Sequence, residues 1–175
     1  MKKILVLGGS GFIGHHLCEA LNRLHYRVMV PTRRLPARSI QTLPFVDVVE
    51  ANVHDEAALD QLVQGQDVVI NLVAILHGSE SEFEQTHVQL PAKLAHACAS
   101  ENVRRLVQVS ALGADVQGPS RYQRSKGRGE QVLLAAAQRD HLALTMLRPS
   151  VIFGKDDQFI NLFAKLQRVF PFMPL

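Results

Sequence analysis

The sequence predicts an α/β protein of three layers, in which helices cover both faces of a doubly wound parallel sheet. Two observations carry this prediction. Short apolar segments alternate along the chain with longer helical ones, and a glycine-rich turn follows the first apolar segment. The chain has 175 residues and a hydrophobic content of 47%, which suits one globular domain with a sizeable core.

Six short apolar segments predict the strands. They lack the polar alternation of half-exposed strands, and such continuous runs are typical of strands buried on both faces of a sheet. The predicted strands are residues 3–7, 27–31, 45–50, 68–73, 105–110 and 142–147.

Four longer segments predict the helices that connect these parallel strands. They are residues 11–24, 55–63, 82–100 and 120–139. Asp55 is placed to cap the second helix and Gly65 to end it, and SEFE at residues 81–84 predicts a capping box at the third. Pro91 lies inside the third helix and predicts a kink or an earlier start there.

The turn after the first strand, in LVLGGSGFIGHHL, places Gly8, Gly11 and Gly14 three residues apart. One glycine permits a tight turn, one lets a pyrophosphate approach the backbone, and one lets the next helix pack against the strand. Strand, turn and helix together predict a dinucleotide site in preference to a purely structural turn. The phosphate donors expected there are the N–H groups of Phe12 and Ile13 and the hydroxyl of Ser10.

The end of the second strand indicates which dinucleotide is bound. An Asp or Glu there would bind the ribose hydroxyls of NAD, whereas an Arg suits the 2′-phosphate of NADP. Thr32, Arg33 and Arg34 occupy this region, and a guanidinium can bind a phosphate through two parallel hydrogen bonds. The sequence favours NADP(H) over NAD(H), with solvated loop charges as the alternative role of the arginines.

Tyr122 and Lys126 lie four residues apart in the predicted helical segment RYQRSKGRGE. This spacing puts them one turn apart on the same face, where they can meet a common ligand. The alternative is a chance spacing on a solvated basic surface. Gly127 and Gly129 each cost a helix about 1 kcal/mol relative to Ala, so we expect a cofactor or another helix to approach closely there.

The composition argues against several other classes. A formal charge of +3, from 19 Lys and Arg against 16 acids without basic blocks, favours an anionic small ligand over nucleic acid. The spacings of the cysteines and histidines suggest no disulfide framework and no metal site, and a reducing cytoplasm fits best. No segment approaches the ~20 apolar residues of an integral membrane span, and the N-terminal apolar run is too short for a secretion signal.

A resemblance to the short-chain dehydrogenase/reductase superfamily rests on six segments: GGSGFIG, TRR, VINLVAIL, VSALGAD, YQRSK and LRPSVIFGKDDQFINLFAKL. More narrowly, the chain resembles the atypical branch that contains the nucleotide-binding accessory subunit of mitochondrial respiratory complex I and its bacterial relatives. This resemblance implies an NAD(P)-binding Rossmann domain over residues 1–154. Because members of the branch continue further, it also implies that residues 155–175 begin a smaller, truncated C-terminal region.

The resemblance implies further contacts to the cofactor. They are Asn52 and Val53 near the adenine, Leu72, Val73 and Ala74 near the ribose, and Pro149, Val151 and Ile152 near the nicotinamide. For the apolar residues, core packing at the strand ends is an equal alternative.

The resemblance also implies catalytic roles. Lys126 would bind the nicotinamide ribose and lower the pKa of Tyr122, whose phenol would exchange a proton with a carbonyl or alcohol. Ser110 is the serine near the end of the fifth strand that can bind the same oxygen, but Leu112, which cannot hydrogen-bond, aligns with the catalytic position. His87 stands where many relatives have an asparagine of a proton relay, and a packed or solvated histidine is the alternative.

Two functions follow as expectations. The first is an NADP(H)-dependent oxidoreductase or epimerase that exchanges hydride with a small carbonyl or nucleotide-sugar substrate. The second is a non-catalytic NADP(H)-binding accessory or assembly factor, which implies a protein partner. Tyr122 and Lys126 favour the first function, whereas Leu112 and His87 weigh against it.

Overall fold

The computed structural model describes residues 1–35, 37 and 40–154 of the chain. In this part, six parallel strands form one sheet in the order β3-β2-β1-β4-β5-β6. The strands are β1 (Lys3–Leu7), β2 (Arg27–Thr32), β3 (Val46–Glu50), β4 (Val68–Asn71), β5 (Arg105–Val109) and β6 (Ala143–Leu147). The strand order reverses between β1 and β4, as in a doubly wound sheet, so the predicted fold class is confirmed.

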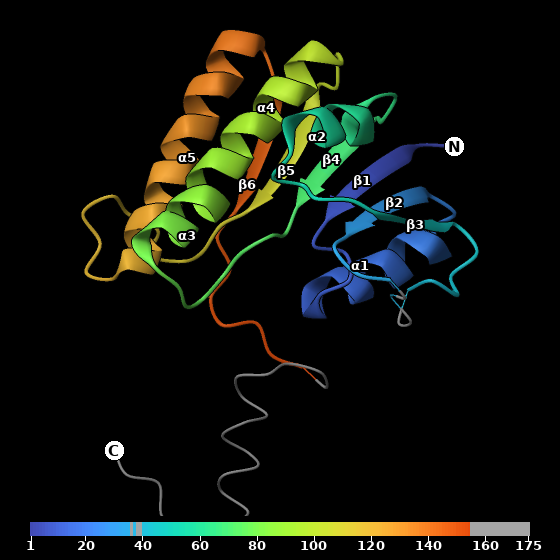
Figure 1. The fold of residues 1–175 in the computed structure, drawn as a ribbon, viewed down its shortest axis with the longest axis horizontal. Coiled ribbons are helices and arrows are strands. Elements are labelled where there is room, and N and C mark those ends of the chain that lie inside the picture. The colour runs from blue at the N-terminus through green and yellow to red at the C-terminus, as the bar shows by residue number, and fades with distance from the viewer. Residues whose placement is uncertain (36, 38–39, 155–175) are drawn as a thin grey trace, which may run out of the picture.

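Helices lie on both faces of the sheet (Figure 1). They are α1 (Phe12–Arg23), α2 (Glu56–Val63), α3 (Glu80–Glu84), the π-helical turn η1 (Gln85–Gln89), α4 (Leu90–Ser100) and α5 (Arg121–Asp140). On one face, buried residues of α2, α4 and α5 pack together, among them Leu59, Leu94 and Leu133. On the other face, Cys18 of α1 packs with strand residues such as Val6.

The face that carries α1 is only partly covered within the described residues. Along β6, Ala143, Thr145 and Leu147 are exposed on this face, and Val107 and Val109 of β5 are half-buried. The opposite face of the same strands packs Leu106 and Leu144 against the helices. Among the described helices, none is long and apolar enough to span a membrane.

The predicted helix at residues 82–100 is interrupted, as Pro91 indicated. It consists of α3, the π-helical turn η1 and α4, with Pro91 in the first turn of α4. Proline has no N–H to donate and is tolerated at the start of a helix. The expected capping box at residues 81–84 is wrong by two residues: Ser79 accepts from Glu82 N, and the Glu82 side chain accepts from Ser79 N.

Other boundaries follow from single side chains. Asp55 caps α2 by accepting from Ala58 N, and Gly65 with φ +70° follows its end, both as predicted. The predicted strand at residues 68–73 ends earlier, at Asn71. The reason is that Asn71 Oδ1 accepts a hydrogen bond from Val73 N at 3.1 Å, which turns the chain out of the sheet.

Candidate functional site

The glycine turn joins β1 to α1 at the carboxyl edge of the sheet. Gly8 adopts φ +79°, which L side chains rarely adopt, and Gly11 N donates to Gly8 O at 3.0 Å. Gly14 is buried against this turn, because a Cβ at Gly14 would lie 2.2 Å from Gly8 O. The turn therefore brings the N-terminus of α1 directly to the end of β1.

The N-terminus of α1 suits an anion. Gly11 is its N-cap, and no side chain of the described residues caps it. The first turn of the helix, which contains Phe12 and Ile13, holds no acidic residue. Its first N–H groups and the positive end of the helix dipole are thus available to a phosphate, and these residues fit the pyrophosphate of a dinucleotide.

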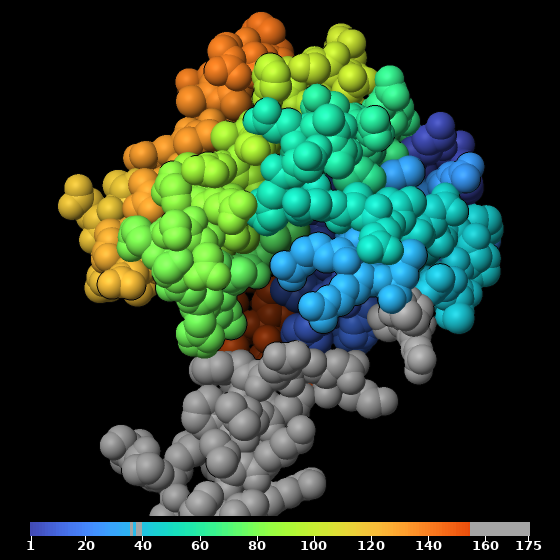
Figure 2. Space-filling view, viewed as in Figure 1, coloured from blue at the N-terminus to red at the C-terminus, as the bar shows by residue number. Residues whose placement is uncertain are grey.

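A cavity of about 840 Å³ opens beside the glycine turn, at the carboxyl ends of β1 to β4. In Figure 2, the surface is hollowed between the light-blue residues after β2 and the green residues around α3. Ten predicted cofactor contacts line it: Gly8, Ser10, Gly11, Thr32, Arg33, Arg34, Val53, Leu72, Val73 and Ala74. The cavity also lies where the strand order reverses, which is the usual ligand site of such sheets.

Five further residues line the cavity that the sequence analysis did not name: Pro31, Ala51, His54, Ile75 and Thr86. Most of them are direct neighbours of predicted contacts after a strand end, and this position was the signal available for them. Thr86 is different, since it comes from η1 and is buried. The position of Thr86 in the cavity wall depends on the π-helical turn η1.

One end of the cavity is cationic. Arg33 and Arg34 are exposed, and the loop is closed by Thr32, whose Oγ1 accepts from Arg34 N at 3.4 Å. His54 is half-buried, and burial together with the charges of Arg33 and Lys93 lowers its pKa. Among the described residues that line the cavity, none is acidic. This end therefore favours an anionic group.

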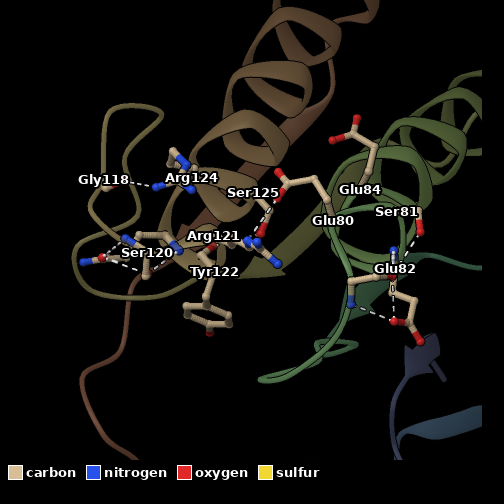
Figure 3. Close-up of polar contacts among 12 residues, drawn as sticks. Glu80, Ser81, Glu82, Glu84, Gly118, Ser120, Arg121, Tyr122, Arg124 and Ser125 are labelled. Carbon is tan, nitrogen blue, oxygen red and sulfur yellow. Dashed lines mark hydrogen bonds and ion pairs between the residues drawn. The ribbon is translucent and has the colours of Figure 1, made fainter.

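Tyr122 and Lys126 lie on α5, and Ser120 begins that helix with a capping box (Figure 3). Lys126 Nζ is 5.9 Å from the centre of the Tyr122 ring, so the predicted shared face is present. Lys126 is buried and donates to Val109 O at 3.1 Å. Neither residue is among those that line the cavity, and the helix that carries both, α5, packs against η1.

The pKa values of this pair reflect burial. Burial lowers the pKa of Lys126 to about 8, against the opposing effect of Glu130. Burial raises the pKa of Tyr122. The resemblance had implied a pKa lowered by the lysine charge, whereas in this structure the pKa of Tyr122 is raised, and the cause is the loss of solvent.

The loop after β5 carries the remaining catalytic candidate, Ser110, and also Leu112, which the resemblance aligns with the catalytic position. Ser110 is 5% exposed, and its Oγ is the one buried side-chain polar atom of the described residues without a hydrogen-bond partner. Such an atom is expected to have a partner in the working protein. Leu112 is 67% exposed.

The other predicted contacts occupy defined places, and their roles remain predictions. Asn52 Oδ1 accepts from His54 N at 3.1 Å within its own turn. Pro149 O accepts from Leu112 N at 2.8 Å, which joins the segment after β6 to the loop after β5. Val151 and Ile152 in that segment are exposed.

His87 is buried and hydrogen-bonded, as in the packed alternative. Its Nε2 accepts from Ile75 N at 3.1 Å, and its Nδ1 lies 2.8 Å from Ser125 Oγ. Burial lowers its pKa to about 3, with a smaller contribution from the charge of Lys126. Ser125 was not among the predicted site residues, because nothing in the sequence around Ser125 indicates this contact.

A sequence profile described as the NAD dependent epimerase/dehydratase family matches residues 4–167. The chain belongs to this family. The family supports a dinucleotide as the ligand of the cavity, and it agrees with the resemblance to short-chain dehydrogenases. The preference for NADP(H) is a separate question that family membership leaves open.

Two relatives of this chain have different kinds of name: one is named as a subunit of a respiratory enzyme and the other as a reductase. Subunit 9 of the NADH dehydrogenase (ubiquinone) 1 alpha subcomplex from Mus musculus is 31% identical over 165 residues, which cover 91% of this chain and 43% of the subunit. A ceramide reductase of Caulobacter vibrioides is 31% identical over 173 residues, which cover 98% of this chain and 53% of the reductase. The chain thus spans about half the length of the curated relatives it matches.

Solved structures of the family show the same fold. A UDP-glucuronic acid 4-epimerase from Bacillus cereus in complex with NAD superposes with a TM-score of 0.81 at 24% identity, covering 95% of this chain and 64% of the epimerase. MoeE5 in complex with UDP-glucuronic acid and NAD has a TM-score of 0.80 at 23% identity, with 93% of this chain and 60% of MoeE5 covered.

Proposed function

We propose that the chain is the cofactor-binding part of an NADP(H)-dependent oxidoreductase that acts on a carbonyl compound or the corresponding alcohol. The observation that carries this proposal is the cavity itself, which has the glycine turn in its wall and Arg33 and Arg34 at one end. The name of the Caulobacter relative, a reductase, supports the same reaction class. Epimerisation through a transient ketone would use the same groups.

Each residue has a role in this proposal. The glycine turn and the N-terminus of α1 bind the pyrophosphate, and Arg33 and Arg34 bind the 2′-phosphate. The cofactor, when bound, supplies or accepts the hydride. Reduction of a carbonyl also needs a proton at its oxygen, and Tyr122 Oη is the donor, with Lys126 beside it.

Ser110 adds a second contact in the same proposal. Its Oγ is buried and has no partner among the described residues, so a substrate oxygen or cofactor that reaches it would supply the missing hydrogen bond. Leu112 contributes apolar surface at this point, so Tyr122 and Ser110 are the side chains of the proposal that meet the charge developing on the oxygen. A reaction with this arrangement is expected to be slower than one with a further hydrogen-bond donor.

The cofactor preference is tested by calorimetric titration with NADPH and NADH. We expect the parent to bind NADPH at least about tenfold more tightly than NADH, because a charged hydrogen bond to the 2′-phosphate contributes about 1.5–3 kcal/mol. Arg33→Ala and Arg34→Ala should reduce this ratio by weakening NADPH binding alone. Arg105→Ala, at the amino edge of β5, is the matched control and should leave the ratio unchanged. Equal affinities in the parent would contradict the 2′-phosphate assignment.

A second function is favoured by Leu112, because a side chain that cannot hydrogen-bond stands open at the catalytic position. In this alternative, NADP(H) stabilises an accessory or assembly factor, and relatives named as complex I subunits support it. The full-length protein and its Tyr122→Phe variant separate the two functions. Turnover of a carbonyl substrate that the variant loses supports the oxidoreductase. A co-purifying partner, with cellular function intact in the variant, supports the accessory factor.

A further inference from the structure

His87 joins two parts of the site that are far apart in the sequence. Its side chain accepts a hydrogen bond from Ile75, in the loop that lines the cavity after β4. On its other side it meets Ser125, on the helix that carries Tyr122 and Lys126.

The hydrogen bonds determine which nitrogen of His87 carries the proton. Ser125 Oγ donates to Tyr122 O at 2.9 Å, so toward His87 it must accept, and Nδ1 is the donor. Ile75 N–H points at Nε2 at 3.1 Å, so Nε2 must carry a lone pair. Both contacts require the same neutral tautomer, with hydrogen on Nδ1. Since both nitrogens are occupied, His87 cannot relay a proton without breaking this bridge.

The groups that face His87 also favour the neutral form. From α5, Lys126 contributes a positive charge and Tyr122 a ring at 5.4 Å between centroids. From α3, the Phe83 ring lies 5.5 Å away. A second positive charge at His87 would be desolvated beside Lys126, consistent with its lowered pKa.

The loop between β4 and α3 is held by three hydrogen bonds near its start. Leu72 N donates to Leu7 O of β1 at 3.0 Å. Asn71 Oδ1 accepts from Val73 N, and Asn71 Nδ2 itself donates to Gln108 Oε1 of β5 at 2.9 Å. His87 provides the third attachment, at Ile75. The main chain of His87 is equally constrained, because a Cβ at Gly129 of α5 would lie 1.9 Å from His87 O. His87 therefore contacts both the loop and α5, through its side chain and its main chain.

We propose that His87 is a positioning residue that couples the cavity loop at residues 72–75 to α5, so that a dinucleotide bound against the loop also orders Tyr122 and Lys126. This coupling uses one part of the proposed function, the binding of a dinucleotide in the cavity, and does not depend on catalysis. Because such coupling is reciprocal, a substitution at His87 that removes its contact with α5 should also weaken the binding of the dinucleotide.

The first test concerns the free protein. In histidine-labelled ¹⁵N NMR, the resonance lost in His87→Leu should show the Nδ1–H tautomer and should not titrate between about pH 5 and 8, where an ordinary histidine does. An imidazolium or an Nε2–H tautomer would overturn the proposal.

The second test measures the coupling. The chain has 2 tyrosines, so the Cζ resonance of Tyr122 is assigned with Tyr26→Phe and followed against pH by ¹³C NMR. We expect NADPH to change its titration midpoint in the parent and to have little effect in His87→Leu. NADPH binding should weaken about tenfold in His87→Leu, the effect of one buried hydrogen bond, and stay unchanged in His96→Leu, an exposed control on α4.

The outcomes are distinguishable. If the parent binds no dinucleotide, the proposed function fails. The coupling is then judged on the free protein, by comparing the titration midpoint of Tyr122 in the parent and in His87→Leu. An unchanged midpoint would overturn the coupling. If His87→Leu does not fold, His87→Gln and His87→Asn replace it. Because His87→Gln keeps an acceptor within reach of Ile75 N–H, this variant should bind NADPH more tightly than His87→Asn, whose side chain is shorter. Equal binding by both variants and the parent would refute the coupling.

Discussion

Gly129 allows α5 and η1 to approach more closely than any other residue would permit. The Cβ of an alanine there would meet His87 O at 1.9 Å, and this neighbour is backbone, which cannot rotate away. The expectation that a helix would approach here is therefore confirmed for Gly129. At Gly127 the close neighbour is the loop before α5 instead, since a Cβ would lie 2.5 Å from Val116 N.

A substitution at Gly129 should accordingly be costly. Although alanine favours a helix by about 1 kcal/mol, overpacking against backbone should give a net loss of about 2–3 kcal/mol in the free energy of unfolding. Denaturant unfolding measures this loss. Gln131→Ala, exposed on the same helix, serves as control and should change stability by less than about 0.5 kcal/mol. A Gly129→Ala protein as stable as the parent would contradict the close contact.

Lys126 should make stability depend on pH in the alkaline range. Its folded pKa of about 8 lies below its ordinary value of 10.5, so between these values the unfolded chain binds more protons. Lys126 should therefore add stability as the pH rises across this window, by at most about 3 kcal/mol, because one pKa unit corresponds to about 1.4 kcal/mol. Above about pH 9, Cys18 and Cys98 act in the opposite direction, because burial raises their pKa values from 9.0 to about 11 and about 12. Urea unfolding of the parent and of Lys126→Met, which cannot titrate, at several pH values isolates the contribution of the lysine. The stability of the parent relative to the variant should rise with pH, and a constant difference would contradict the lowered pKa of Lys126.

At the scale of elements, hydrogen bonds at the start of α5 place the turn that carries Tyr122. Ser120 accepts from Gln123 N at 3.1 Å, and Gln123 Oε1 accepts from Ser120 N at 3.2 Å (Figure 3). This capping box starts α5 just before Tyr122. The residue pattern predicted the start at this position, because a cap is a contact between near neighbours.

Loss of this cap should destabilise the protein modestly. Ser120→Ala removes the acceptor for Gln123 N and should cost about 1 kcal/mol, while Ser120→Asp, which keeps an acceptor, should cost little. Thermal unfolding of both variants provides the measurement. If alanine and aspartate have the same effect, the hydrogen bond is not the source of the stability.

The interrupted helix shows where prediction from local pattern ends. Pro91 indicated a disturbance, but not that η1 would absorb it as a π-helical turn. That turn sets which residues of the segment face the cavity and which face α5: Thr86 lines the cavity, while His87 bonds to Ser125. Such a register depends on the neighbouring helix, which the local sequence does not contain.

At the scale of the whole molecule, α2, α4 and α5 cover one face of the sheet in the described residues, whereas the opposite face is only partly covered. The exposed side chains of β6 lie on that second face. The curated relatives are about twice as long as this chain. The cavity, by contrast, is lined by residues between Gly8 and Thr86, so dinucleotide binding can be measured on this chain.

Bound cofactor should therefore stabilise the chain. At an NADPH concentration of 100 times its dissociation constant, mass action adds about 2.7 kcal/mol to the free energy of unfolding. Thermal unfolding with increasing NADPH should show a continuous rise in Tm, and adenosine alone at the same concentrations should give a smaller one. A Tm that does not respond to either NADPH or NADH would argue against a dinucleotide site in the cavity.

The sheet, the glycine turn and most of the cavity residues could be predicted from the amino-acid sequence. These depend on local requirements: apolar runs form buried strands, Gly8 adopts a positive φ, and parallel strands place their following loops at one edge. The hydrogen bonds of His87 could not be predicted in this way, because its partners Ile75 and Ser125 lie 12 and 38 residues away. The same holds for the pKa of Tyr122, which burial raises. Burial and long-range hydrogen bonds arise from packing between elements, and no spacing within one segment encodes them.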